Sequence, residues 1–230
     1  MTARTLEFHR FSQAAPNAVE FTPRDLVIAG WTGRDQAAVE HHIEELALLG
    51  VKRPSSTPTY YRVSAGLLTQ GATVQTLNQD SSGEAEPVLF SMREGLFLGV
   101  GSDHTDRKVE AYSVAVSKQM CAKPVSRVLW DCREIYGHWD QLIIRSYIEE
   151  GKKRVLYQEG RLAQIRPPQN LLDGYAKSGK LAVGIVMFLG TFAAKGGVRF
   201  AKRFEMELED PVLRRTIRHG YNIDVIPEVA

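Results

Sequence analysis

Cysteine is scarce in this chain, with only Cys121 and Cys132 among 230 residues. Two cysteines are too few for a disulfide framework or a thiolate zinc site. Long apolar runs are also missing, because the longest one, residues 181–189, is too short to span a bilayer. The first residues contain no apolar signal core. We therefore expect a cytoplasmic protein that makes no membrane contact.

An excess of charge of one sign is absent as well. The 29 basic residues nearly balance the 27 acidic ones, which leaves a net charge of +2 and no electrostatic footprint for nucleic acid. The chain contains no phosphate-loop lysine motif and no Gly-x-Ser-x-Gly elbow, and Gly99-Val-Gly101 lacks the third glycine of a dinucleotide site. We expect a small-molecule ligand and no nucleic-acid partner.

The residues that are present favour a single strand-rich α+β domain. The chain is 43% hydrophobic and long enough to bury one sizeable core. Apolar patterning predicts strands at 6–11, 26–29, 88–92, 96–100, 142–148, 154–158, 184–189 and 203–209. Helices are expected at 36–49, where Gly50 ends the helix, at 106–120, and from 167 towards 175. The alternation of strands and helices is irregular, which is typical of an α+β domain.

Two of these elements carry predictions about burial. The strand at 184–189 shows no polar alternation, and we expect it to be buried on both faces. In the helix at 106–120, helical spacing directs Val109, Val116 and Met120 inward, together with Tyr112 or Ser113.

A dense charged cluster follows the strand at 96–100: Asp103, His104, Asp106, Arg107 and Glu110. Carboxylates beside an imidazole suit proton transfer, because each group shifts the pKa of the other towards neutrality. The same oxygen atoms could hold Mg²⁺. Alternatively, the segment is a helix start, with Asp106 as the cap and Arg107 paired with Glu110 on the surface. The residues alone leave both interpretations open.

A second segment, residues 189–197, is the end of a buried strand followed by a turn of small residues. Strand ends that release polar groups onto a rigid rim are common places for binding and catalysis. We expect residues 101–110 and 190–197 to face one cleft. Arg34, in a loop with Trp31, could hold the carboxylate of an acidic substrate, or could form a surface ion pair.

The two segments resemble the fumarylacetoacetate hydrolase superfamily. The active-site loop of that superfamily reads roughly Gly-x-Asn-Tyr-x-x-His-x-x-Glu, with Lys-Pro further on. Residues 101–110 and Lys123-Pro124 are similar to it. Residues 190–196 and 204–222 are similar to its Gly-Thr-Pro-x-Gly turn and the following strands. The resemblance covers residue 96 to the C-terminus and points to a bacterial branch of unknown function, with residues 1–95 as the N-terminal strands and helix of the same domain.

This resemblance implies a mixed β-sandwich roll that is usually dimeric, so we expect a homodimer. It also implies the cleavage, hydration or decarboxylation of 1,3-dicarbonyl and 2-oxo acids. In the superfamily a divalent metal polarises the enolisable carbonyl group and a His–Glu pair activates water. The cofactor expected here is Mg²⁺ or Mn²⁺.

Carried over by position, Glu110 matches the glutamate of the pair, Thr191 the threonine of the turn, and Lys123 the lysine before proline. The histidine of the superfamily falls on Arg107. Its Glu-x-Glu metal pair, expected on a strand after Lys-Pro, falls near residues 139–142, where Asp140 is the carboxylate.

We therefore expect an enzyme, a carbon–carbon hydrolase or a lyase, that acts on a small carboxylated oxo or 1,3-dicarbonyl compound. The alternatives are a hydratase or decarboxylase of a 2-oxo acid, and a non-catalytic small-acid binding protein on a degenerate scaffold. The expected catalytic residues are His104, Glu110 and Asp106. The expected substrate-binding residues are Arg107, Lys123, Arg145, Thr191 and Arg34. The expected metal ligands are Asp103 and Asp140.

Overall fold

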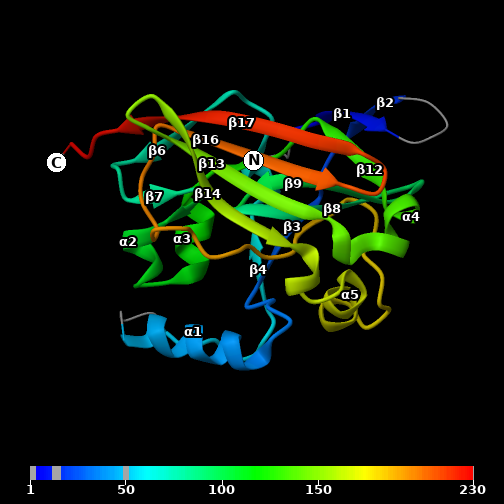
Figure 1. Ribbon diagram of the computed structural model, residues 1–230, viewed down its shortest axis with the longest axis horizontal. Helices are drawn as coiled ribbons and strands as arrows, with labels where there is room; N and C mark the ends of the chain where they lie inside the picture. The colour runs from blue at the N-terminus through cyan, green and yellow to red at the C-terminus, as the bar shows by residue number, and fades with distance from the viewer. Residues whose placement is uncertain (1–3, 12–16, 49–51, 230) are drawn as a thin grey trace.

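Two curved β-sheets form the body of the computed structural model, which describes residues 4–11, 17–48 and 52–229 (Figure 1). The larger sheet has eight strands in the order β2 (Asn17–Phe21), β1 (Leu6–Phe11), β12 (Val128–Asp131), β9 (Gly95–Ser102), β8 (Ala85–Met92), β15 (Ile185–Phe188), β3 (Asp25–Gly30) and β4 (Thr59–Val63). The smaller sheet has the order β14 (Lys153–Arg161), β13 (Ile143–Glu150), β16 (Arg203–Asp210), β17 (Arg215–Ile226) and β6 (Thr73–Leu77).

Shorter elements surround the sheets. Two-residue strands form two small ladders, β10 (Thr105–Asp106) with β7 (Ser81–Ser82) and β11 (Lys123–Pro124) with β5 (Leu68–Thr69). The α-helices are α1 (Gln36–Leu48), α2 (Arg107–Glu110), α3 (Val114–Met120), α4 (Cys132–Ile135) and α5 (Pro168–Tyr175). Three 3₁₀ turns cover Ala65–Leu67, Tyr136–Gln141 and Leu162–Gln164. Figure 1 shows α1 set apart from both sheets.

The core occupies both faces of the eight-stranded sheet. Alternate residues such as Leu89 and Met187 belong to a buried cluster shared with the five-stranded sheet, whereas their neighbours Phe90 and Phe188 pack into a second cluster with Phe8. All four residues of β15 are buried, which confirms that this strand is covered on both faces. In the described part of the chain, every helix is too short or too polar to cross a bilayer.

The sheets are mixed, as predicted for an α+β roll. In the large sheet β1 runs parallel to β12 and β15 runs parallel to β3, whereas the pairs β8–β9 and β15–β8 are antiparallel. The strands predicted at 88–92 and 96–100, and those at 142–148 and 154–158, are present and pair as the hairpins β8–β9 and β13–β14. In the first helix Ile43 is buried, and the expected helix end at Leu49 and Gly50 lies outside the described residues.

The helix expected over 106–120 is interrupted, and the prediction of its buried face was wrong. The Ser113 side chain accepts a hydrogen bond from the Val116 N–H and begins a new helix, α3. Tyr112 is 85% exposed, and Met120 is exposed as well, whereas Lys118 is buried. The restart changes which face of the segment points inward. Lys118 therefore points to the interior, where it forms an ion pair with Asp103.

Candidate active site

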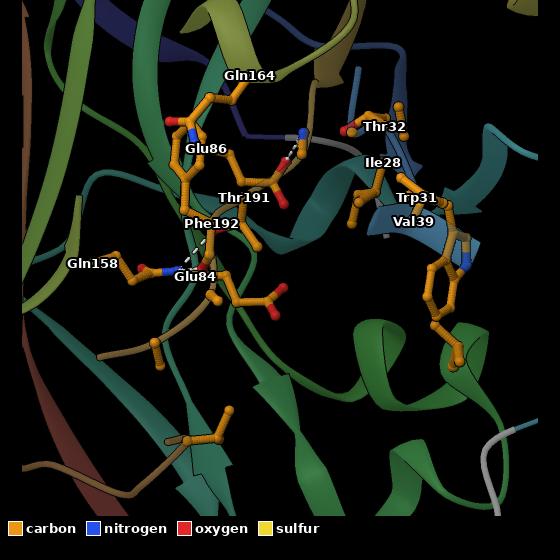
Figure 2. Close-up of a pocket in the computed structure, with 18 of the residues that line it drawn as sticks. Ile28, Trp31, Thr32, Val39, Glu84, Glu86, Gln158, Gln164, Thr191 and Phe192 are labelled. Atoms are coloured by element: carbon orange, nitrogen blue, oxygen red, sulfur yellow. Dashed lines mark hydrogen bonds between the residues drawn. The ribbon is translucent and has the colours of Figure 1, made fainter. Parts of the chain in front are cut away.

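A cavity of about 1190 Å³ lies where the large sheet, α1, the α2–α3 segment and the turn after β15 meet (Figure 2). Arg107 and Glu110 line it from one predicted segment, and residues 190–194 line it from the other. The expectation that residues 101–110 and 190–197 face one cleft is thereby confirmed for Arg107 and Glu110 of the first segment. The hairpin β8–β9 and the pairing of β15 with β8 bring these distant segments together.

Three carboxylates gather at one side of this cavity: Glu84, Glu86 and Asp103, named here the acidic triad. One oxygen atom from each of them lies within 4.8 Å of the others. The β8–β9 register places them, because Glu86 pairs with Gly101 and the Asp103 N–H donates to the Glu84 carbonyl oxygen at 2.9 Å. Glu84 and Glu86 line the cavity, and Asp103 is fully buried behind them.

The charges of the acidic triad are strongly perturbed. Burial raises the pKa of Glu86 well above its ordinary value, and the neighbouring Asp103 and Glu84 raise it further. Burial also acts to raise the pKa of Asp103, but the ammonium groups of Lys118 and Lys123 hold it below its ordinary value. Three carboxylates so close together need positive charge between them.

Two buried lysines supply part of that charge. Lys118 donates to Asp103 and lies 3.8 Å from Glu84, and Lys123 lies 3.1 Å from Asp103. Burial acts to lower the pKa of Lys118, but Asp103 and the two glutamates hold it above its ordinary value. Burial is the largest cause of the raised pKa of Glu86, and the neighbouring carboxylates add to it. Carboxylate oxygens are the ligands that a hard divalent cation prefers, so the donor set of the acidic triad fits such a cation.

The two predicted metal ligands lie in different places. Asp103 belongs to the acidic triad. Asp140 is exposed and accepts two hydrogen bonds from Arg34, at 2.9 and 2.7 Å, so it lies outside the triad. The Glu-x-Glu pattern that approaches Asp103 is Glu84-Ala85-Glu86, which precedes Lys123 in the chain instead of following it. A sequence signal existed: two glutamates with strand spacing at the start of a fully buried strand need a compensating charge.

His104 is buried away from the cavity lining. Its Nδ1 hydrogen-bonds with the Tyr221 hydroxyl at 2.8 Å and its Nε2 with the Ser81 hydroxyl at 2.9 Å. Burial lowers the pKa of His104 to about 3, and the charges of Lys123 and Arg107 act in the same direction. The prediction of His104 as the base that meets the substrate does not fit this geometry, because both ring nitrogens are already engaged.

Asp106 is a helix cap, which was the alternative interpretation of this segment. Its side chain accepts a hydrogen bond from the Val109 N–H at 2.9 Å and caps α2. It is buried outside the cavity lining. The backbone of this segment therefore uses Asp106 as a cap, and its expected catalytic role finds no support in its position.

Arg107 and Glu110 form a charged bridge on the cavity wall. Arg107 lies 2.9 Å from Glu110 and 2.9 Å from Glu84, and its Nε donates to the Ser82 hydroxyl at 2.7 Å. Burial acts to lower the pKa of Arg107, but the two glutamates raise it above its ordinary value. A permanently charged guanidinium thus connects Glu110 to the acidic triad.

The remaining predicted binding residues are spread over the molecule. Thr191 lines the cavity; its hydroxyl donates to the Ala85 carbonyl oxygen at 2.9 Å and accepts from Gln158 at 2.8 Å. Arg34 lines the cavity as well. Lys123 is fully buried behind the acidic triad. Arg145 lies on β13, is bound to Glu159 and Glu209, and does not line the cavity, so its predicted contact with substrate does not fit.

Lys118 and Gln158 also line the cavity, although the sequence did not predict them. One continuous helix over 106–120 would direct Val109, Val116 and Met120 inward, so the apolar spacing offered no reason to expect Lys118 in the interior. Gln158 is buried on β14 and carries no local signal, since only the pairing of strands shows that its amide donates to Thr191 and to the Phe192 carbonyl oxygen.

Solved structures with this architecture define the class of fold. A yeast fumarylacetoacetate hydrolase family protein, ynq8, is 14% identical with a TM-score of 0.63, over 90% of this chain and 95% of the other. A 2-keto-3-deoxy-D-arabinonate dehydratase complexed with magnesium and 2,5-dioxopentanoate is 11% identical with a TM-score of 0.62, over 92% and 77%. A 4-oxalocrotonate decarboxylase from Pseudomonas putida G7, complexed with calcium and acetate, is 15% identical with a TM-score of 0.55, over 87% and 76%.

The fold is therefore that of the fumarylacetoacetate hydrolase superfamily, as the sequence predicted. The chain belongs to the family described as protein of unknown function DUF2848, which it matches over residues 29–221. The match begins well before residue 96, where the sequence resemblance was first seen, and so includes the acidic triad and the loop around Trp31. No curated protein matches the chain significantly.

Proposed function

We propose that this protein is a metal-dependent enzyme that hydrolyses a carbon–carbon bond in a small carboxylated 1,3-dicarbonyl or oxo compound. The observation that carries the proposal is the acidic triad, whose oxygens lie within 4.8 Å of one another beside Lys118 and Thr191 in one cavity. The fold neighbours support it, since a dehydratase was solved with magnesium and an oxo acid and a decarboxylase with calcium and acetate.

The acidic triad would hold Mg²⁺ or Mn²⁺. The cation would supply positive charge that stabilises an enolate as it forms on the substrate. Glu84 and Glu86 offer oxygens on the cavity side, and Asp103 offers one from behind. The Gly190 N–H donates to Glu86 at 2.7 Å and fixes the direction of its carboxylate.

Polar groups of the chain surround the place where the substrate would lie. Lys118 can neutralise a carboxylate of the substrate, and Thr191 lines the same cavity. The ammonium of Lys118 is held by Asp103 and Glu84, so its position is set before the substrate arrives. Preorganised charge of this kind stabilises negative charge that develops during a reaction.

Glu110 is the candidate base. It lines the cavity, and its carboxylate is oriented by Arg107 at 2.9 Å. In a hydrolysis it would take a proton from a water molecule, whose oxygen then attacks the distal carbonyl carbon. The bond between that carbon and the enolisable carbon breaks, and the electron pair passes to the oxo acid fragment as its enolate. Glu110 would then return the proton to the enolate carbon, which gives the oxo acid and a carboxylic acid and restores the base.

A lyase is the second candidate. It is favoured by the dehydratase and the decarboxylase among proteins with this fold. Either reaction would use the same enolate, with a hydroxyl group or carbon dioxide leaving instead of an acyl group. A non-catalytic small-acid binding protein is the remaining alternative, and it predicts binding without turnover.

Calorimetry of Mg²⁺ and Mn²⁺ binding tests the acidic triad, and a panel of 2-oxo and 1,3-dicarbonyl acids tests the reaction. We expect Glu86→Gln to lose cation binding, because the amide carries no charge. The amide oxygen can still accept the hydrogen bond from the Gly190 N–H, so the local structure should be retained. The matched control is Glu94→Gln, since Glu94 is half exposed and pairs with Arg10 outside the cavity. Equal cation binding by both variants would exclude the acidic triad. Cation-dependent binding of acids without turnover would establish the binding protein.

A further inference from the structure

One part of the cavity wall is apolar. The side chains of Ile28, Trp31, Val39, Tyr61 and Val114 line it and are named here the apolar wall. Figure 2 shows Trp31 and Val39 across the open space from Glu84. None of these five side chains carries a charge, so this side of the cavity offers a ligand apolar surface.

The charged residues next to the apolar wall are engaged elsewhere. Arg34 donates to Asp140 through both terminal nitrogens, at 2.9 and 2.7 Å. Asp35 accepts from the N–H groups of Ala37 and Ala38, at 2.9 and 3.1 Å, and so caps α1. Both charges are directed to their own partners, which leaves the apolar wall as the surface that a ligand would meet.

The apolar wall is tightly built. A Cβ atom at Gly30 would lie 2.9 Å from the Tyr61 ring, and one at Gly33 would lie 2.6 Å from Val39. Between these two glycines Trp31 has a φ of 59°, a left-handed conformation that a bulky side chain rarely adopts. Such strain persists only where the surrounding structure holds it, and it collects at functional sites. The surrounding structure thus holds the backbone of this loop in one conformation at the cavity wall.

Tyr61 joins the apolar wall to the charged side. Its hydroxyl accepts a hydrogen bond from the Trp31 indole at 3.4 Å, and its ring centroid lies 5.8 Å from the Lys118 ammonium. The Lys118 ammonium, the Tyr61 ring and the Trp31 indole therefore lie next to one another on the cavity wall. One ligand with a charged end and an apolar end could contact all three.

The cavity has room for a ligand larger than a short oxo acid. Pockets of about 300–1000 Å³ already enclose drug-sized molecules, and this cavity has a volume of about 1190 Å³. A short oxo acid bound at the acidic triad would leave the apolar wall in contact with water, where its surface contributes nothing to affinity.

From these observations we propose that the substrate carries an apolar group of at least phenyl size, at the end remote from its carboxylate, which packs on Trp31, Val39 and Tyr61. The substrate class is then an aryl- or long-alkyl-substituted oxo acid. This inference rests on the proposed function, because it places the carboxylated end at the acidic triad.

Two acids that differ only at the remote end test the inference. They are 2,4-dioxopentanoate, which ends in a methyl group, and 2,4-dioxo-4-phenylbutanoate, which ends in a phenyl ring. Affinity is measured by calorimetry with Mg²⁺ present, and turnover as kcat/KM. We expect the phenyl compound to be preferred by roughly 10- to 100-fold, the gain from burying one aromatic ring.

Variants of the apolar wall should change only that preference. We expect Trp31→Ala to remove most of it while the affinity for the methyl compound stays the same, and Trp31→Phe to retain it. If Trp31→Ala fails to fold, Val39→Ser tests the same wall from α1. The control is Tyr112→Ala, because Tyr112 is 85% exposed outside the cavity lining.

The outcomes separate this inference from the proposed function. Equal affinity of the wild type for both acids would overturn the inference and leave the proposed function standing. Equal losses for both acids in Trp31→Ala would also overturn it. Failure of the wild type to bind either acid in the presence of Mg²⁺ would contradict the proposed function, and the inference with it.

Discussion

The carboxylate of Glu86 accepts a hydrogen bond from the backbone N–H of Gly190 at 2.7 Å. This contact joins the acidic triad to the turn after β15. A third segment meets them, because a Cβ atom at Gly190 would lie 1.9 Å from the hydroxyl oxygen of Thr32. Three segments therefore pack together at Gly190: the loop with Trp31, the turn with Thr191 and the start of β8.

We expect Gly190→Ala to destabilise the protein by more than about 1–3 kcal/mol, the range for strained backbone alone. The backbone at Gly190 has a φ of 110°, and the new methyl group would also collide with Thr32. Urea unfolding followed by circular dichroism measures the effect. Gly137→Ala is the control, since a Cβ atom there meets nothing within 4 Å. Equal midpoints for the two variants would contradict the prediction.

The buried His104 should make the fold sensitive to acid. Burial lowers its pKa from 6.5 to about 3. Between these two pH values His104 is protonated in the unfolded chain but stays neutral in the folded protein. The free energy of unfolding should therefore fall as the pH is lowered through this window, by up to about 1.4 kcal/mol per pH unit for this one group.

His104→Gln removes this proton uptake, and we expect its stability to depend less steeply on pH between about 6 and 4. The measurement is a series of urea unfolding curves at several pH values. His41→Gln is the control because the His41 side chain is 73% exposed. A pH dependence identical to that of the wild type would show that His104 is protonated as readily in the folded protein as in the unfolded chain.

Asp103 and Asp140 were both expected to bind a metal, and the structure now separates them. We expect Asp103→Asn to abolish the binding of Mn²⁺, because it removes one of three neighbouring carboxylates. Asp140→Asn should leave the affinity unchanged, since its carboxylate binds Arg34. Calorimetric titration of both variants, after circular dichroism has shown that they are folded, makes the comparison. Loss of binding in Asp140→Asn would place the cation elsewhere.

Glu110→Gln should lower kcat by roughly 10²–10⁴-fold, the usual contribution of a general base. Binding of an unreactive analogue such as oxalate should survive, because the acidic triad and Lys118 are untouched. The control is the exposed Glu149, replaced by Gln. A normal kcat in Glu110→Gln would leave the cavity as the active site but would assign proton transfer to another residue.

Local pattern was enough to find several elements of this fold. Strand β16 alternates buried and partly exposed side chains over Arg203–Asp210, and the strands predicted at 88–92 and 96–100 are present as β8 and β9. The break between α2 and α3 was not predicted. It depends on one hydrogen bond, from the Val116 N–H to the Ser113 side chain, and apolar spacing does not show that bond. Thr191 was predicted by the resemblance of residues 190–196 to the turn of the superfamily, which follows a buried strand.

Short-range periodicity predicted an α+β domain and the buried strand β15, and the resemblance of residues 101–110 and 190–196 to the superfamily predicted the roll and the segments of its site. Which charged groups face one another depends on the tertiary structure. Glu84 and Glu86 meet Asp103 through the register of β8 and β9, and Lys118 reaches them only after the helix restarts. Burial and opposing charge set the ionisation of these groups, and both depend on residues distant in the chain.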